Sequence, residues 1–327
     1  MKYFPLSIVT TTAGILYHGA TMDLDTIKYL GELSTEQPNP NSLGIDTKST
    51  VEMLQIINSE DRRVPEAVAP AIPAIARVVD LVVERFRRGG RLLYVGAGTS
   101  GRLGVLDAAE CPPTYGTPPE MVQGIIAGGL EALTRSIEGA EDSESDGAAA
   151  IDQKEVGEAD VVVGITASGH APYVLGAMKR ARERGAVVAA LSCNRNSRTF
   201  ALADHRICVE VGPEIVSGST RMKSGTAQKL VLNMITTTAM IRLGKVYNNL
   251  MVDLRPVNKK LVVRSKRLIQ LASGCDETTA ERAFEESGRR PKTAIVMVLL
   301  GVSREKAESL LERNEGRIGL AVRAAGG

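Results

Sequence analysis

The chain has 327 residues, of which 43% are hydrophobic, 24% charged and 3% aromatic. This composition is typical of a folded protein with an aliphatic core, and it disfavours recognition by stacking bases or sugar rings on aromatic side chains. The net charge is +2, and the Lys and Arg residues are spread along the sequence. Neither nucleic acid nor a membrane surface is therefore predicted as a partner.

The N-terminal stretch and the cysteines bear on the compartment. The early apolar run contains one basic residue, Lys2, and Pro5 interrupts it, which disfavours a secretory signal. No stretch of about 20 apolar residues is present that could span a membrane. The four cysteines are far apart and form no CxxC pair, which disfavours zinc or a disulfide framework. We predict a cytoplasmic protein in which residues 1–45 are an N-terminal extension.

Helical patterns begin after this extension. Ser49 or Thr50 is a suitable cap for a helix whose apolar residues cluster on one face. A second, longer helix is predicted over residues 64–88, because apolar residues recur there at helical spacing and Gly89-Gly90 follows.

Short apolar runs then alternate with helical segments. Continuous runs of this kind indicate strands of a parallel sheet that is covered by helices on both faces. In such sheets ligands bind at the carboxyl ends of the strands. We predict an α/β fold over residues 46–260 and a small all-helical domain over residues 261–327. The predicted strands lie near 91–96, 121–129, 160–165, 186–194 and, more weakly, 205–211, with a helix over 172–184 and a long helix after the loop at 217–220.

The first strand is followed by a segment rich in Gly, Ser and Thr, at 96–102. It differs from a dinucleotide-binding turn, because hydroxyl residues occupy the turn and the next strand ends in Gly instead of an acid. Backbone N–H groups at a helix N-terminus, together with hydroxyl groups, suit a phosphate monoester. An ordinary helix cap is the alternative for each such loop taken singly. Three loops of this kind are predicted, at Thr99-Ser100, Ser168-Gly169 and Ser217-Gly218-Ser219-Thr220.

Three acidic residues follow the first loop's helix and the second predicted strand. Pro112 and Pro113 predict an extended exit after Glu110, which would leave the Glu110 side chain near the strand ends. Glu138 and Glu141 follow the second predicted strand. A glutamate beside a phosphate loop acts as general acid or base if burial raises its pKa. A solvated surface acid is the alternative for each of the three.

Four long motifs together resemble one known family. They read GAGTSGRLGVLDAAECPPTYG, IAGG followed by IEGAEDS, VVVGITASG with PYV, and SGSTRMKSGTAQKLVLNMITT. The motifs closely resemble the N-acetylmuramic acid 6-phosphate etherase family, whose core is a sugar isomerase (SIS) domain. The similarity runs from about Leu43 to near the C-terminus. His170 departs from the family pattern, because some relatives are expected to carry Arg at this position. The difference bears on how the protein contacts the carboxylate of the substrate's lactyl group.

The resemblance implies a reaction and a set of roles. The family cleaves the lactyl ether at C3 of N-acetylmuramic acid 6-phosphate, giving N-acetylglucosamine 6-phosphate and D-lactate, in the recycling of cell-wall peptidoglycan. By that similarity Glu110 corresponds to the proton donor and Glu141 to a second active-site acid, and no metal or other cofactor is implied. Family members are homodimers, so a homodimer is expected. The residues implied to contact the substrate are Thr99, Ser100, Ser168, Glu138, Ser219 and Thr220.

Two other functions are compatible with the same loops. An aldose–ketose isomerase would share the phosphate loops and an acid that moves a proton at C2. A non-catalytic sugar-phosphate sensor would need neither acid, and it commonly carries a helix-turn-helix that we do not find in this sequence. Because one fold hosts all three functions, lactate release is the observation that separates them.

Overall fold

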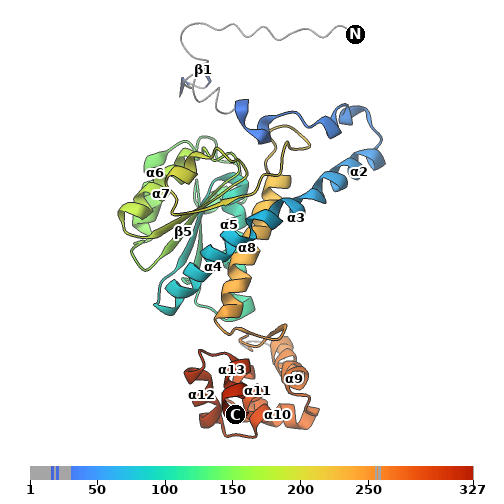
Figure 1. Ribbon diagram of the computed structural model, residues 1–327, viewed down its shortest axis with the longest axis vertical. Coiled ribbons are helices and arrows are strands. Elements are labelled where there is room, and N and C mark those ends of the chain that lie inside the picture. Colours follow the sequence, from blue (N-terminus) through green and yellow to red (C-terminus); the bar gives the residue numbers. More distant parts are fainter. Residues whose placement is uncertain (1–15, 18–19, 22–30, 255, 257–258, 327) are drawn as a thin grey trace.

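The structure is a computed structural model that describes residues 16–17, 20–21, 31–254, 256 and 259–326. Figure 1 shows a larger α/β domain, a smaller helical domain at its far end, and an arm that contains α2. The prediction that no secretory signal is present concerns a segment that lies largely outside the described residues. Within that segment, β1 (Leu16–Tyr17) and β2 (Ala20–Thr21) form a short antiparallel pair.

The centre of the larger domain is a parallel sheet of five strands in the order β4-β3-β5-β6-β7. The chain passes from β3 to β4 at one edge and then returns across β3 to β5, so the direction of strand addition reverses beside β3. The predicted parallel sheet is confirmed. The strands are β3 Leu92–Gly96, β4 Val122–Ile126, β5 Val161–Thr166, β6 Val187–Ser192 and β7 His205–Cys208.

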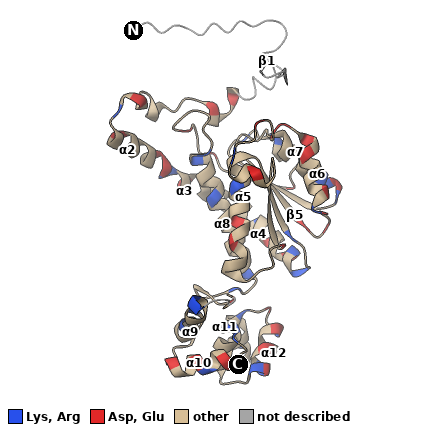
Figure 2. Ribbon diagram, turned by 180° about the vertical axis from the view of Figure 1, so that it is seen from behind, with Lys and Arg blue, Asp and Glu red and all other residues tan. Residues whose placement is uncertain are grey.

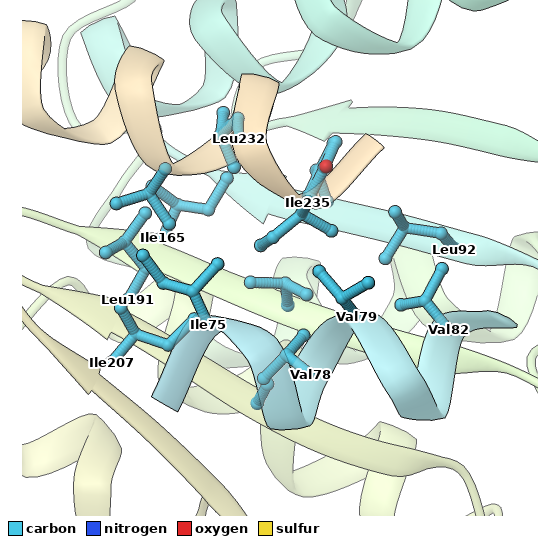
Figure 3. Packing of buried hydrophobic residues seen from close by; sticks show 14 of the residues in the cluster. Ile75, Val78, Val79, Val82, Leu92, Ile165, Leu191, Ile207, Leu232 and Ile235 are labelled. Atoms are coloured by element: carbon cyan, nitrogen blue, oxygen red, sulfur yellow. The ribbon is translucent and has the colours of Figure 1, made fainter. Parts of the chain in front are cut away.

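Helices cover both faces of the sheet. Because side chains alternate along each strand, every strand contributes apolar residues to both of these layers. Leu92 and Tyr94 pack on one face with α4, α5 and α8, whereas Leu93 and Val95 pack on the other with α6 and α7. Figure 3 shows the first of these layers, in which α4 and α8 meet over the strands. The helices are α4 Ile72–Arg87, α5 Gly98–Tyr115, α6 Glu144–Gln153, α7 Pro172–Glu183 and α8 Lys223–Arg242.

The helix predicted to begin at Ser49 or Thr50 is confirmed as α2 (Thr50–Asp61). Ser49 forms a capping box with Glu52, whose carboxylate accepts the Ser49 N–H at 2.8 Å. Most of α2 is exposed, so it forms an arm that projects from the domain (Figure 1). The short 3₁₀ helices are η1 Ser34–Glu36, η2 Pro40–Ser42, η3 Ile45–Thr47, η5 Leu130–Leu133 and η6 Arg198–Ala201.

The prediction of one continuous helix over residues 64–88 is wrong, because two helices occupy this range. A 3₁₀ turn, η4 (Ala69–Ala71), separates α3 (Arg63–Val68) from α4. Pro70 lies in this turn and Pro73 in the first turn of α4. Proline has no N–H to donate to the preceding turn, so the α-helical bonding is interrupted there.

The extended exit predicted after Glu110 is also wrong. Helix α5 continues through Pro112 and Pro113 to Tyr115, and the N–H of Gly116 closes it by donating to the Pro112 carbonyl. Both prolines lie in the last part of α5, where the loss of their two N–H groups does not prevent the final turn, which the Gly116 N–H closes. Glu110 is therefore a helical residue with an exposed side chain.

The helices at the C-terminal end have a hydrophobic core of their own. Ile269, Phe284 and Ile295 are buried in it, and Val252 joins it from the connecting hairpin. Charged residues of both signs lie along the outer helices (Figure 2). None of the helices within the described part of the chain is long and apolar enough to cross a membrane. The elements are β8 Val246–Tyr247, β9 Leu250–Met251, α9 Lys259–Ser273, α10 Glu277–Glu286, α11 Pro291–Leu300, α12 Arg304–Arg313 and α13 Ile318–Gly326.

Candidate active site

The strand order reverses beside β3, at the carboxyl edge of the sheet where the candidate site lies. The segment after β3 leads to α5 on one face, and the segment after β5 leads to α7 on the other face. Ligands of doubly wound sheets bind where two neighbouring strands send their connections to opposite faces. Of the two predicted loops at this point, Ser168-Gly169 lies in the connection after β5, whereas Thr99 and Ser100 lie in the first turn of α5 instead of in a loop.

The first turn of α5 is open to an anion. Its N-cap residue, Ala97, provides no side-chain acceptor, so the N–H groups of the first turn have no cap. Ser100 is buried, and its hydroxyl donates to Oε1 of Gln228 on α8 at 2.9 Å. Thr99 lies against Gly225, at the start of α8. The dipole of α5 and its uncapped N–H groups together favour a phosphate at this end of the helix.

Hydrogen bonds within the loop after β5 hold its backbone in place. The N–H of Gly169 donates to Thr166 Oγ1 at 3.2 Å, and the N–H of His170 donates to Ser168 Oγ at 3.2 Å. Gly169 has a φ of 81°, and a Cβ on it would lie 2.3 Å from the hydroxyl oxygen of Ser197. Only glycine fits this position without strain, so the loop that carries Ser168 packs closely against Ser197.

The loop before α8 offers hydroxyl groups but no helix N-terminus. Glu214 is fully buried, and its carboxylate accepts the N–H groups of Lys223 and Ser224, both at 2.9 Å. The first turn of α8 is thus capped by a carboxylate of the protein itself. The hydroxyls of Ser219 and Thr220 are what this loop can present to a ligand, and α5 supplies the helix N-terminus.

Glu141 lies beside the loop after β5. Its carbonyl accepts the N–H of Tyr173, in the first turn of α7, at 2.9 Å. Desolvation by the surrounding protein raises the pKa of the Glu141 carboxyl, and the negative charges of Asp142 and Glu138 raise it further. The group formed by Glu138 and Glu141 is thus attached, through this backbone hydrogen bond, to the start of α7, which follows the Ser168 loop.

Glu110 is not part of this group within one chain. It lies about 15 Å farther along α5 than Ser100, given the rise of an α-helix. The path from the phosphorus of a sugar 6-phosphate to C3 crosses only O6, C6, C5 and C4, and is much shorter.

Burial raises the pKa of the Cys111 thiol, next to Glu110, to about 12, so this thiol stays neutral.

Comparisons with known proteins place the chain in a family. The model of the SIS domain matches residues 142–238, and that of the glucokinase regulatory protein N-terminal SIS domain matches residues 74–182. N-acetylmuramic acid 6-phosphate etherase of Klebsiella aerogenes is 54% identical over 88% of this chain and 96% of that protein. The chain belongs to the N-acetylmuramic acid 6-phosphate etherase family.

A second curated relative agrees with this assignment. The N-acetylmuramic acid 6-phosphate etherase of Rubrobacter xylanophilus is 52% identical over 89% of this chain and 97% of that protein. A phosphoheptose isomerase of Neisseria gonorrhoeae, a solved structure, is 18% identical with a TM-score of 0.46, covering 58% of this chain and 99% of that one.

One segment at this edge of the sheet was missed by sequence reasoning. Residues 33–42 lie against the loops at the carboxyl edge, and Leu33, Thr35, Asn39 and Ser42 are buried there. The sequence Asn39-Pro40-Asn41 indicates a turn but not its partner. The available signal was the turn alone, because polar residues without periodicity give no prediction of burial.

Proposed function

We propose that this chain cleaves the C3 lactyl ether of N-acetylmuramic acid 6-phosphate, giving N-acetylglucosamine 6-phosphate and D-lactate. Similarity to etherases over nearly the whole length of both chains carries the proposal. The reaction serves peptidoglycan recycling in the cytoplasm, where the four free cysteines would stay reduced. The site geometry supports a substrate with one phosphate group.

In this proposal the phosphate binds at the first turn of α5. The N–H groups near Thr99 and Ser100 donate to it, and the Ser168 hydroxyl approaches from the neighbouring loop. Ser219 and Thr220 add hydroxyl donors from the loop before α8. Glu138, beside Glu141, contacts the sugar. The phosphate thereby directs the open-chain sugar toward the segment between β4 and α6 that carries Glu138 and Glu141.

The chemistry needs an acid and a base and proceeds through elimination and hydration. After ring opening, the C2 proton lies α to the C1 aldehyde, so a carboxylate can remove it. The electron pair forms the C2=C3 bond, the C3–O bond breaks, and lactate leaves with a proton from Glu110. Glu110, now ionised, takes a proton from the water that adds at C3, and C2 regains a proton. Glu141, with its raised pKa, either removes the C2 proton or orients the substrate.

We propose a homodimer in which Glu110 reaches the site of the partner subunit. Leu106, one turn before Glu110 on α5, is 54% exposed, and Met234 on the adjacent α8 is 36% exposed. The residues next to them, Asp107 and Asn233, join α5 to α8 by a hydrogen bond of 2.7 Å, and exposed apolar side chains on adjoining helices indicate a protein contact surface. A partner chain on this surface would bring its own α5 alongside and would provide the acid that each chain lacks near its phosphate loops.

Lactate release in isotopically labelled water tests the function. With N-acetylmuramic acid 6-phosphate as substrate, we expect lactate, deuterium at C2 of the product from deuterium oxide, and label at the C3 oxygen from oxygen-18 water. Ketose phosphate without lactate would instead identify an isomerase. Binding of the sugar phosphate without any turnover would identify a sensor.

Replacing Asp142 by Asn should move the acidic limb of the pH profile of kcat/KM to lower pH. The negative charge of Asp142 helps to raise the pKa of the Glu141 carboxyl, so removing this charge lowers that pKa. If Glu141 acts as the base, activity falls when it is protonated, and a lower pKa preserves activity at lower pH. The control is Glu120→Gln at the amino edge of the sheet, which should leave the limb in place. An unmoved limb in Asp142→Asn would assign the limb to another group.

A further inference from the structure

Asn194 lies just after β6, and its side chain joins two segments that are distant in sequence. The side chain is buried, with 4% of the residue exposed. Its Nδ2 donates to the Ala167 carbonyl at 2.8 Å and to Thr35 Oγ1 at 3.3 Å. Its Oδ1 accepts the N–H of Ser34 at 3.1 Å and the Ser34 hydroxyl at 2.9 Å. The Ser34 N–H can only donate and the Ala167 carbonyl can only accept, so the orientation of the amide is determined.

Ser34 and Thr35 belong to residues 33–42, which we call the N-terminal strap. The Thr35 carbonyl accepts the N–H of Gly218, in the loop before α8, at 3.1 Å. Gly218 has a φ of 73°, and a Cβ on it would lie 2.8 Å from Glu36 Oε2. The strap therefore packs closely on this loop, beside which it lies in Figure 1. Through Asn194 it is also bonded to the residue that precedes Ser168.

The far end of the strap is anchored as firmly. Asn39 Nδ2 donates to Glu60 Oε2 at 2.9 Å and to the Pro213 carbonyl at 3.1 Å. The Ser42 hydroxyl donates to the Ile215 carbonyl at 2.7 Å. Both side chains are buried. Because both ends are fixed, the middle of the strap holds a constant position relative to the two hydroxyl loops.

We propose that the N-terminal strap sets the spacing between the loop after β5 and the loop before α8, and that Asn194 is a positioning residue for phosphate recognition. The inference rests on the proposed function, in which Ser168 and Ser219 bind one phosphate from two sides. Groups that bind a ligand together have to be held to within about 0.5 Å of the productive geometry. The strap provides this, since Asn194 and Thr35 link the two loops through buried hydrogen bonds.

Replacing Asn194 by Leu tests this role, because Leu has a similar size and forms no hydrogen bond. We expect the Kd of inorganic phosphate, measured by calorimetry, and the KM of the sugar phosphate to rise on the order of 10- to 100-fold, as for a small misplacement of binding groups. The value of kcat at saturation should change much less, because neither Glu110 nor Glu141 contacts Asn194. The matched control is Asn58→Leu on exposed α2, which should behave as the native chain.

A second pair keeps the test decisive if Asn194→Leu does not fold. Thr35→Val removes the Oγ1 acceptor without changing the shape of the side chain, and should weaken phosphate binding. Thr35→Ser keeps the hydroxyl and should restore it. Unchanged Kd and KM in both Asn194→Leu and Thr35→Val would overturn the inference, even if their Tm is lower. Native protein that binds phosphate without releasing lactate would contradict the proposed reaction alone, and the strap would still be tested by phosphate binding.

Discussion

Replacing Glu110 by Gln should reduce kcat/KM for lactate release by about 10²- to 10⁴-fold, the usual contribution of a general acid or base. Gln has the shape of Glu but cannot deliver a proton to the leaving lactate or accept one from water. Because the Glu110 side chain is exposed, Tm should stay close to the native value. The measurement is lactate release under saturating and limiting substrate, and native activity in this variant would remove Glu110 from the mechanism.

Complementation between two inactive variants tests which subunit supplies Glu110. Glu110→Gln and Glu141→Gln chains are co-expressed with different tags. If Glu110 acts in the partner's site, each mixed dimer has one site that contains both native acids. Random pairing should then restore about a quarter of the native activity, since half of the dimers are mixed and each has one intact site. If both acids of a site come from one chain, no activity returns. A monomeric protein in sedimentation would contradict the arrangement directly.

The sheet and the loops of the site could be predicted because their signals are local. The central strands are continuous apolar runs, since both faces of the sheet are covered, and the Ser168 loop follows directly from the end of β5. The paths through the prolines were harder to predict. Pro70 interrupts a periodic helix, whereas Pro112 and Pro113 do not end α5. The difference depends on the position of each proline within its helix and on tertiary packing.

The capping of α8 and the N-terminal strap could not be read from the sequence, because both depend on distant partners. Glu214 was not singled out, although its carboxylate occupies the first turn of α8. Asn194 and Ser34 are 160 positions apart. A buried polar side chain has no periodic pattern of its own, so its burial becomes visible only when its hydrogen-bond partners are located.

Replacing Lys223 by Met should lower the free energy of unfolding by about 3–5 kcal/mol, the cost of leaving a buried charge without its partner. Lys223 Nζ lies 2.6 Å from Glu60 Oε2, and the two side chains are 2% and 4% exposed. Glu60 keeps the amide donors of Asn39 and Asn41 but loses the buried cation beside it, and its other ion-pair partner, Arg63, is mostly exposed. Thermal unfolding should shift down by about 6–20 °C. The control is Lys229→Met at an exposed position of the same helix, which should leave Tm near the native value.

The pH dependence of stability distinguishes a lost ion pair from lost packing. Although burial opposes ionisation, hydrogen bonds from Lys223, Asn39 and Asn41 and the charge of Lys223 lower the pKa of Glu60 from 4.5 to about 2. A lowered folded-state pKa stabilises the native state above the unfolded value, and this contribution is lost as pH falls from about 4.5 toward 2. The double variant Glu60→Gln with Lys223→Met should regain part of the lost stability and lose this part of the pH dependence. If Lys223→Met alone were as stable as the native chain, the pair would not hold α2 and the strap against α8.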